Sequence, residues 1–424
     1  MDIIIRNARI NDPLSLFHNQ TKDLLISQGL IALVDDNIAN LDNYPEYQAD
    51  DLCVSNGWFD IRASFADPGY EQKEDFISGT RAAAAGGFTS VAILPDTKPI
   101  IQGKSEIEYI LSKTKENPVR VYPLGALTHN LESREISEMY DMFLAGAIGF
   151  SNANYPLDKA DVLERALLYT KSFDALILLH EQDISFTKKA QMHEGINSTL
   201  LGMKGFPALA EFTQIQRDLE VLRYVGGKLH FSHISTARSV QIIKQAKAEG
   251  LRVSCDVAAA QLYFTDAALL EYDSNYKVNP PFRAQEDIDA LKLAVLDGTI
   301  DAICSDHTPH EIEQKRVEFD FAAFGIAGIQ TVFPILNMVF SAEQIHDIVH
   351  HNLVAKPRQL FNLSVPKIKI GETANLTLYS TKSQWVLNEK TNQSKASNNP
   401  LWNTDLTGMI DAIINNNQII WNQQ

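Results

Sequence analysis

The sequence is poor in cysteine and has no long hydrophobic run. Its 424 residues include only three cysteines, Cys53, Cys255 and Cys304, which are odd in number and far apart. This spacing argues against a disulfide framework and a CxxC metal site, and it favours a reducing, cytoplasmic environment. No run of about eighteen apolar residues occurs, so we expect no membrane-spanning segment. The stretch Met1–Arg6 lacks the basic and apolar regions of a signal peptide, so none is expected.

Positive charge is also in deficit. The chain has 37 Lys and Arg against 53 Asp and Glu, which gives a formal net charge of −16. This acidic balance argues against a nucleic-acid partner, because phosphate backbones are bound through basic surfaces. Hydrophobic residues make up 45% and charged residues 21%, the ordinary balance of a globular protein with a sizeable core. The length allows two domains, or one barrel with an appendage.

Short apolar runs recur between residues 57 and 354, and most are followed by a stretch with helical periodicity. Several runs are continuously apolar, which is typical of parallel strands buried on both faces. Eight strands alternating with helices predict an α/β fold of the (β/α)8 (TIM) barrel type, although a doubly wound open sheet shows the same alternation. The predicted strands are Trp58–Phe65, Ser90–Leu94, Val119–Pro123, Ala147–Ser151, Leu176–His180, Leu229–Ile234, Arg252–Ala258 and Ala302–Asp306.

The two ends of the chain show β signals without intervening helices. We therefore predict a small composite β-sandwich domain from residues 1–56 and 355–424, beside a barrel domain of residues 57–354. The polar stretch Asn388–Asn399 is expected to be a surface loop. The predicted terminal strands are Asp2–Ile5, Asp23–Ser27, Leu30–Val34, Asn375–Tyr379, Met409–Ile413 and Ile419–Trp421.

Functional side chains of a barrel lie at the C-terminal ends of its strands. His180, His233 and Asp306 end three of the predicted strands, and two histidines with an aspartate are half of a plausible metal site. The alternative is that the histidines are hydrogen-bonded core residues and that Asp306 caps the next helix. Position alone does not decide between them. The other polar residues at predicted strand ends are Arg62, Ser64, Asp96, Asn152, His307 and His310.

Several motifs along most of the chain resemble those of dihydroorotases, members of the amidohydrolase superfamily related to allantoinases and hydantoinases. The resemblance implies a barrel with a composite β-sandwich from both termini, which agrees with the pattern of strands above. The motifs are Phe59-Asp60-Ile61, Asp67-Pro68-Gly69, Lys73–Phe76, Gly79–Thr89, His233–Ala237, Lys277–Arg283 and Asp306–His310.

The resemblance also implies a metal site, which this chain keeps only in part. Members of the family bind zinc through His-x-His on the first strand, a carboxylate after the fourth, histidines on the fifth and sixth, and an aspartate on the eighth. His180, His233 and Asp306 match the last three positions, and Asp306 matches the catalytic aspartate. The positions of the other ligands are replaced by Arg62, Ser64 and Asn152.

The positions that would contact substrate are altered in a similar way. Asn279 and His310 match substrate-binding residues of the family. Asp96 stands where the family has the asparagine of a Pro-Asn-Thr turn, and Ala66 replaces an arginine that holds the substrate carboxylate. A carboxylate in place of an amide removes a hydrogen-bond donor from this subsite.

Hydrolysis of a cyclic amide by this route needs a hydroxide near neutral pH, which a metal supplies by lowering the pKa of bound water from 15.7 to about 7. We therefore expect a degenerate, pseudo-dihydroorotase type of protein with no resident metal cofactor. The resemblance implies a noncatalytic partner of aspartate transcarbamoylase and a homodimer. The alternative is an active cyclic-amide hydrolase with a single zinc at His180, His233 and Asp306. An ordinary dihydroorotase would need the ligands that are missing.

The replacement of a histidine by Arg62 predicts a specific contact. Without metal ions, Asp306 would be an uncompensated, partly buried charge, which costs several kcal/mol. We expect Arg62 to pair with Asp306 through two hydrogen bonds of its planar guanidinium group. His180 and His233 would then be neutral and hydrogen-bonded to water or to each other. In the alternative, Arg62 turns to solvent and pairs with Asp67 or Glu71.

Overall fold

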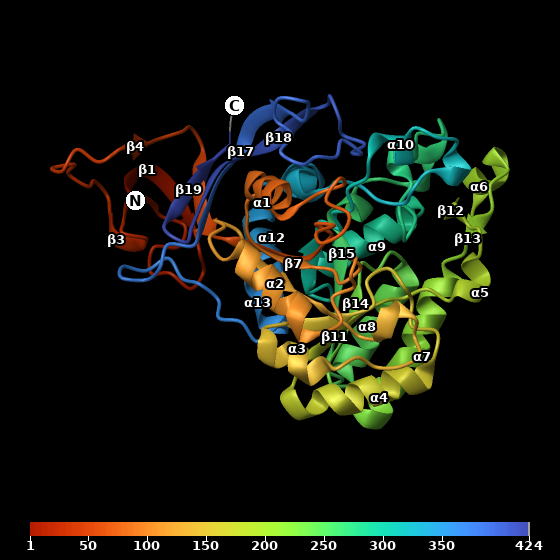
Figure 1. The fold of residues 1–424 in the computed structure, drawn as a ribbon. Coiled ribbons are helices and arrows are strands. Elements are labelled where there is room, and N and C mark those ends of the chain that lie inside the picture. The colour runs from red at the N-terminus through yellow and green to blue at the C-terminus, as the bar shows by residue number, and fades with distance from the viewer. Residues whose placement is uncertain (423–424) are drawn as a thin grey trace.

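Eight parallel strand positions form a closed barrel in the computed structural model, which describes residues 1–422 (Figure 1). The hydrogen-bonded orders β6-β7-β8 and β9-β10-β11-β14-β15-β16 form its wall. A parallel bridge between Ala63 and His307 joins the last strand to the first. The predicted barrel fold is therefore confirmed. The strands are β6 (Trp58–Ala63), β7 (Phe88–Ile93), β8 (Arg120–Pro123) with β9 (Gly125–Ala126), β10 (Gly149–Ser151), β11 (Leu176–His180), β14 (Leu229–Ser232), β15 (Val253–Ala258) and β16 (Ala302–Cys304).

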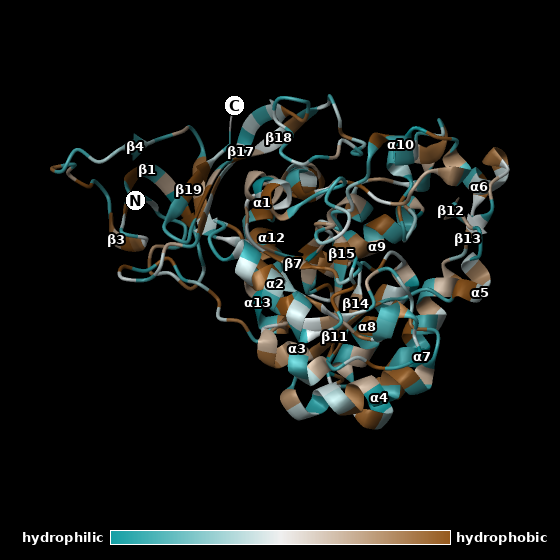
Figure 2. Cartoon of the chain, viewed as in Figure 1, coloured by the Kyte–Doolittle hydropathy of each residue, from teal (hydrophilic) through white to brown (hydrophobic). Residues whose placement is uncertain are grey.

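Amphipathic helices surround the barrel, with apolar residues on the inner face and polar residues on the outer face (Figure 2). Helix α4, for example, buries Val162, Leu163, Ala166 and Leu167. The longer helices are α1 (Phe76–Ala85), α2 (Lys104–Thr114), α3 (Met139–Ala145), α4 (Ala160–Thr170), α7 (Leu209–Val225), α8 (Ala237–Ala248), α9 (Gln285–Leu296) and α11 (Val332–Val339). The shorter ones are α5 (Ile184–Thr187), α6 (Ile196–Leu201), α10 (Ile312–Lys315), α12 (Ile345–Ile348) and α13 (Lys356–Leu360).

A second sheet combines strands from both ends of the chain. Its order is β19-β18-β17-β5-β1-β2-β3, with β4 paired to β1. The antiparallel pairing of β5 with β17 joins the N-terminal strands to the C-terminal ones. This confirms the composite β domain as part of the fold class, while its sequence limits remain a prediction. The strands are β1 (Asp2–Asn11), β2 (Thr21–Ser27), β3 (Leu30–Asp35), β4 (Glu46–Tyr47), β5 (Leu52–Asn56), β17 (Leu376–Val386), β18 (Asp405–Asn415) and β19 (Gln418–Trp421).

The stretch Asn388–Asn399 is not the simple surface loop that its polarity predicts. Its Ser394 hydroxyl and Lys395 backbone N–H donate hydrogen bonds to the buried Glu74 carboxylate. Asn399 is only 2% exposed and donates to the carbonyl of Ala327 at 3.0 Å. The segment packs on the barrel because its Asn and Ser side chains satisfy buried polar groups there.

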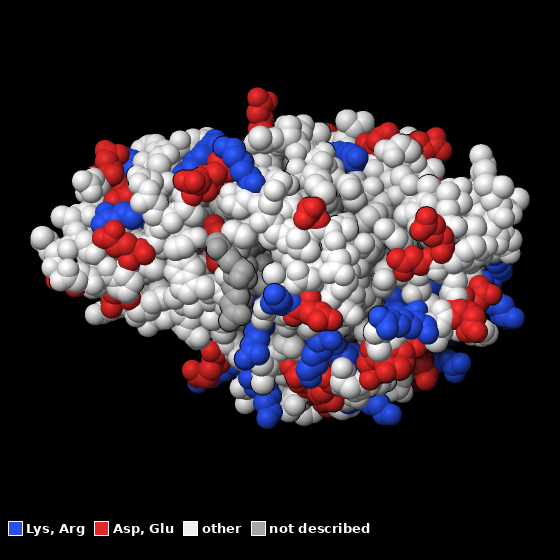
Figure 3. Space-filling model, turned by 90° about the horizontal axis from the view of Figure 1, so that it is seen from above, with Lys and Arg blue, Asp and Glu red and all other residues white. Residues whose placement is uncertain are grey.

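Charges of both signs are mixed on the face seen from above in Figure 3. Lys and Arg side chains alternate with Asp and Glu there and form no continuous basic track. This agrees with the expectation that the chain does not bind nucleic acid, which remains a prediction. Among residues 1–422, no helix is long and apolar enough to cross a membrane.

Candidate functional site

The strand ends bring Arg62, His180, His233 and Asp306 together at one end of the barrel. Arg62 lies on β6, His180 ends β11, and the other two follow β14 and β16. His233 and Asp306 adopt φ angles of 41° and 46°, in the left-handed region that residues other than glycine seldom occupy. Such strain persists only where surrounding contacts enforce it, and it is frequent at functional sites. His233 Nδ1 lies 3.6 Å from Asp306 Oδ2.

Arg62 forms a buried ion pair with Asp306. Its Nε donates to Asp306 Oδ1 at 2.9 Å, and the arginine is only 1% exposed. This confirms the predicted pairing and excludes the alternative in which Arg62 turns to solvent. The expected double grip on the carboxylate is wrong, because Nη2 of Arg62 donates to the side-chain oxygen of Asn154 instead. Nε and Nη2 form the edge of the guanidinium that could bind both oxygens of one carboxylate. Here each of these two donors binds a different residue.

The charges around Asp306 keep it ionised. Burial by itself would raise the pKa of this carboxyl, but the positive charge of Arg62 and the neighbouring His233 more than offset burial and lower the pKa to about 2. A carboxylate with such a low pKa is a weak base at neutral pH, so Asp306 is poorly suited to accept a proton from a reacting group.

His180 and His233 contact each other directly. His233 Nε2 and His180 Nδ1 lie 2.7 Å apart, so one ring donates a hydrogen bond to the other. Nε2 of His180 lies 2.9 Å from the side-chain oxygen of Gln182 and 3.3 Å from Nδ2 of Asn279. Burial, together with His233 and Arg62, lowers the pKa of His180 well below its usual value. The predicted contact between two histidines is confirmed.

This arrangement does not fit a metal ion. Two nitrogen ligands at 2.0–2.1 Å from a tetrahedral zinc stand about 3.3 Å apart and point their lone pairs at the metal. The facing nitrogens of His180 and His233 are 2.7 Å apart and are joined by a hydrogen bond instead. The guanidinium of Arg62 adds a permanent positive charge beside the only nearby carboxylate that matches a ligand position. Within residues 1–422, no group of three or more His, Cys, Asp or Glu is arranged to hold a metal.

Asn152, Ser64 and Asp96, which align with other ligand or substrate positions in the family resemblance, have different surroundings. Asn152 accepts hydrogen bonds from the backbone and the hydroxyl of Thr128, both at 3.1 Å. The backbone N–H of Ser64 donates to the carbonyl of His307 at 2.8 Å and helps to close the barrel. Asp96 lies near Arg62, and its buried Oδ1 has no hydrogen-bond partner in the described chain. Burial raises the pKa of Asp96, and the charge of Arg62 opposes this shift.

The two residues that match substrate contacts of the family already have partners inside the protein. Nδ2 of Asn279 donates to the side-chain oxygen of Gln182 at 3.0 Å. Both ring nitrogens of His310 lie 2.8 Å from oxygens, one on the Gln314 side chain and one on the Phe324 backbone. A substrate could bind His310 only by displacing these hydrogen bonds, which is costly in this conformation. The side-chain oxygen of Asn279, by contrast, is buried and has no hydrogen-bond partner within residues 1–422.

Two residues that complete the network were not expected from the sequence. Asn154 holds Arg62, and Gln182 links His180 to Asn279. Each lies two positions beyond a predicted site residue, Asn152 and His180, and this proximity is the only signal that the sequence offers. The combined site is a charge-balanced, hydrogen-bonded cluster of side chains.

The fold and the site define the class to which the chain belongs. The structure is similar to an L-hydantoinase (dihydropyrimidinase) from Arthrobacter aurescens, with a TM-score of 0.84 and 21% identity over 99% of this chain and 96% of that one. It is also similar to a dihydropyrimidinase from Brevibacillus agri, with a TM-score of 0.82 and 20% identity over 100% and 96% of the two chains. These similarities establish the fold of the chain, a barrel with a composite β domain.

Sequence comparison narrows the class. A family model described as "Dihydro-orotase-like" matches residues 53–239. A protein named dihydroorotase from Geotalea daltonii is 37% identical over 411 residues, which cover 96% of both chains. Another from Geobacter metallireducens is 34% identical over 423 residues, 99% of this chain and 100% of that one. The chain belongs to the dihydroorotase-like family.

Proposed function

We propose that this protein is a pseudoenzyme of the dihydroorotase-like family, which serves pyrimidine biosynthesis as a scaffold rather than by hydrolysing dihydroorotate. One observation carries the proposal: the guanidinium of Arg62 is paired with Asp306 at a position where the resemblance places a metal ligand. Relatives named dihydroorotase connect the chain to the pathway.

The chemistry of the cluster supports the loss of hydrolysis. A bound metal would supply hydroxide near neutral pH, but the donor set here does not fit one. No side chain of the cluster replaces that function, because Asp306 is ion-paired with a pKa of about 2 and burial lowers the pKa of His180. A general base at neutral pH needs a pKa near 7.

The partner proposed for the scaffold is aspartate transcarbamoylase, as the resemblance implies, and the protein itself is proposed to be a homodimer. If natural selection preserves the surface that binds a partner but not catalysis, the barrel is expected to stay well packed while the catalytic metal ligands are lost. Sedimentation of the purified protein, alone and mixed with the transcarbamoylase of its own host, tests both expectations. A monomer that forms no complex at micromolar concentrations would contradict them.

The second candidate function is a cyclic-amide hydrolase that uses one zinc at His180, His233 and Asp306. The proximity of these three residues favours it, since His233 Nδ1 and Asp306 Oδ2 are only 3.6 Å apart. Elemental analysis of the purified protein and a turnover assay with added zinc separate the two functions. We expect no stoichiometric metal and no measurable turnover of dihydroorotate. One zinc per chain with turnover of about 1 per second or more would establish the hydrolase.

A further inference from the structure

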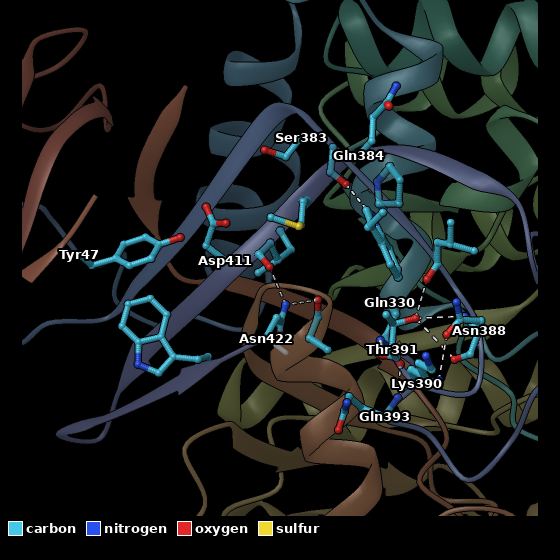
Figure 4. Close-up of a pocket in the computed structure, with 18 residues that line it drawn as sticks. Tyr47, Gln330, Ser383, Gln384, Asn388, Lys390, Thr391, Gln393, Asp411 and Asn422 are labelled. Atoms are coloured by element: carbon cyan, nitrogen blue, oxygen red, sulfur yellow. Dashed lines mark hydrogen bonds between the residues drawn. The ribbon is translucent and has the colours of Figure 1, made fainter. Parts of the chain in front are cut away.

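A large cavity lies between the composite sheet and the barrel, away from the cluster of Arg62 and Asp306. Its volume is about 1040 Å³, and strands β17, β18 and β19 line it together with residues of β4, α1 and α11. Small-molecule sites commonly have such volumes and lie where two domains meet. Figure 4 shows its polar and aromatic side chains, among which Asp411 and Lys390 are the only charged ones in the lining.

Asp411 is a buried carboxyl group without an adequate partner. It is only 5% exposed, and its Oδ2 has no hydrogen-bond partner of normal geometry within residues 1–422. Burial raises the pKa of Asp411 to about 6, and the neighbouring Tyr47 hydroxyl opposes this shift. Lys390 lies on the other side of the cavity, among Gln330, Asn388 and Thr391 (Figure 4), so it does not neutralise Asp411. A buried carboxylate is stabilised by a hydrogen-bond donor, and most strongly by a positively charged donor. Asp411 has no such donor on Oδ2 within residues 1–422.

Aromatic rings stand beside this carboxyl group. The rings of Tyr47 and Trp421 have their centroids 4.4 Å apart and are tilted by 51°. Trp421 lines the cavity and is 39% exposed, so its ring is accessible to a ligand. In Figure 4 the Tyr47 hydroxyl points toward Asp411. Aromatic faces next to a carboxylate recognise organic cations, because the ring faces and the carboxylate both attract positive charge.

We propose that this cavity is a binding site for a small organic ammonium ion, with the ammonium on Asp411 and its apolar part against Tyr47 and Trp421. The ammonium group supplies both the missing donor and the missing positive charge. A neutral alcohol of the same shape supplies only a donor, so it would leave the carboxylate uncompensated. The cavity contains no residue of the cluster around Arg62 and Asp306. A failure of this proposal would therefore leave the proposed function unaffected, and the reverse also holds.

Benzylamine and benzyl alcohol form a matched pair of probes for this site. Binding to the full chain is measured by titration calorimetry and by the fluorescence of the tryptophans, two of which line the cavity. We expect benzylamine to bind about tenfold or more tightly than benzyl alcohol at pH 7.5. The preference for the amine should decrease below pH 6 as Asp411 becomes protonated.

Asp411→Asn keeps the shape of the side chain but removes its charge, so benzylamine affinity should fall at least about tenfold. Asp405→Asn is the matched control, because Asp405 is an exposed carboxylate on the same strand but outside the cavity lining, and it should bind benzylamine as the original chain does. Trp421→Ala should weaken both probes through loss of the ring contact. Absence of benzylamine binding, equal binding of the two probes, or equal loss in the Asp411 and Asp405 variants would overturn the proposal.

Discussion

Arg62 Nε lies 2.9 Å from Asp306 Oδ1, although 244 positions separate the two residues in the chain. The ion pair joins the first and last strands of the barrel, because Arg62 lies on β6 and Asp306 lies in the turn after β16. Breaking a buried pair leaves one charge without compensation, and this costs far more than breaking a surface pair. We therefore expect the pair to contribute to the stability of the folded chain.

The first prediction concerns the ion pair itself. Arg62→Ala should lower the free energy of unfolding by about 3–5 kcal/mol, because Asp306 would remain buried without its partner. Urea denaturation measures the change. Arg165→Ala is the control, since Arg165 pairs with Asp161 on an exposed helix surface, and it should change stability by less than about 0.5 kcal/mol. Adding Asp306→Asn to the Arg62 variant should restore part of the loss, and a further decrease would contradict this account.

The second prediction concerns Asn154, the other acceptor of Arg62. Asn154→Ala should destabilise the protein by about 1–2 kcal/mol, because one donor of a charged group loses its partner. The effect should nearly vanish in a chain that already carries Arg62→Ala, since the two residues share one interaction. Equal effects of Asn154→Ala in both backgrounds, measured in a double-mutant cycle, would show that Asn154 acts independently of Arg62.

The third prediction restores the ligands that the family resemblance implies. The triple change Arg62→His, Ser64→His and Asn152→Asp removes the permanent cation and supplies imidazole and carboxylate donors. Zinc should then raise the melting temperature of the triple variant, because a metal that binds the folded state stabilises it. Zinc and chelators should leave the melting temperature of the original chain unchanged. A zinc-dependent shift in the original chain would favour the hydrolase function instead.

The fourth prediction concerns pH and Asp411, whose pKa burial raises to about 6. The folded state holds this proton more tightly than the unfolded state, where the pKa is about 3.9. Protonated Asp411 therefore favours the folded state, and its contribution to the free energy of unfolding is fully present below about pH 4. This contribution is lost as the pH rises through about 6 and the buried carboxyl group ionises. Asp411→Asn should match the original chain at pH 4 and exceed its stability by about 1–3 kcal/mol above pH 7. An effect independent of pH, in parallel denaturation curves, would show that Asp411 is not a buried titrating group.

The sequence pattern by itself predicted alternating strands and helices between two β-rich ends, and the family resemblance implied that they form a barrel with a composite sheet. Continuous apolar runs identify buried parallel strands, and the predicted Leu176–His180 coincides with β11. Because functional residues of a barrel lie at strand ends, the positions of His180, His233 and Asp306 were also predictable. The contact of Arg62 with Asp306 was predicted from the cost of an unpaired buried charge together with the family resemblance, which places Arg62 at the position of a histidine ligand.

Only the tertiary structure decided how these side chains share their partners. The division of the Arg62 donors between Asp306 and Asn154 depends on the spacing of β6, β10 and β16, which no local pattern encodes. The burial of Asn399 against Ala327 depends likewise on a segment distant in the chain. Strand patterns record which face of an element is buried, whereas hydrogen-bond partners and the cavity beside Asp411 arise from distances between elements that are set when the whole chain packs.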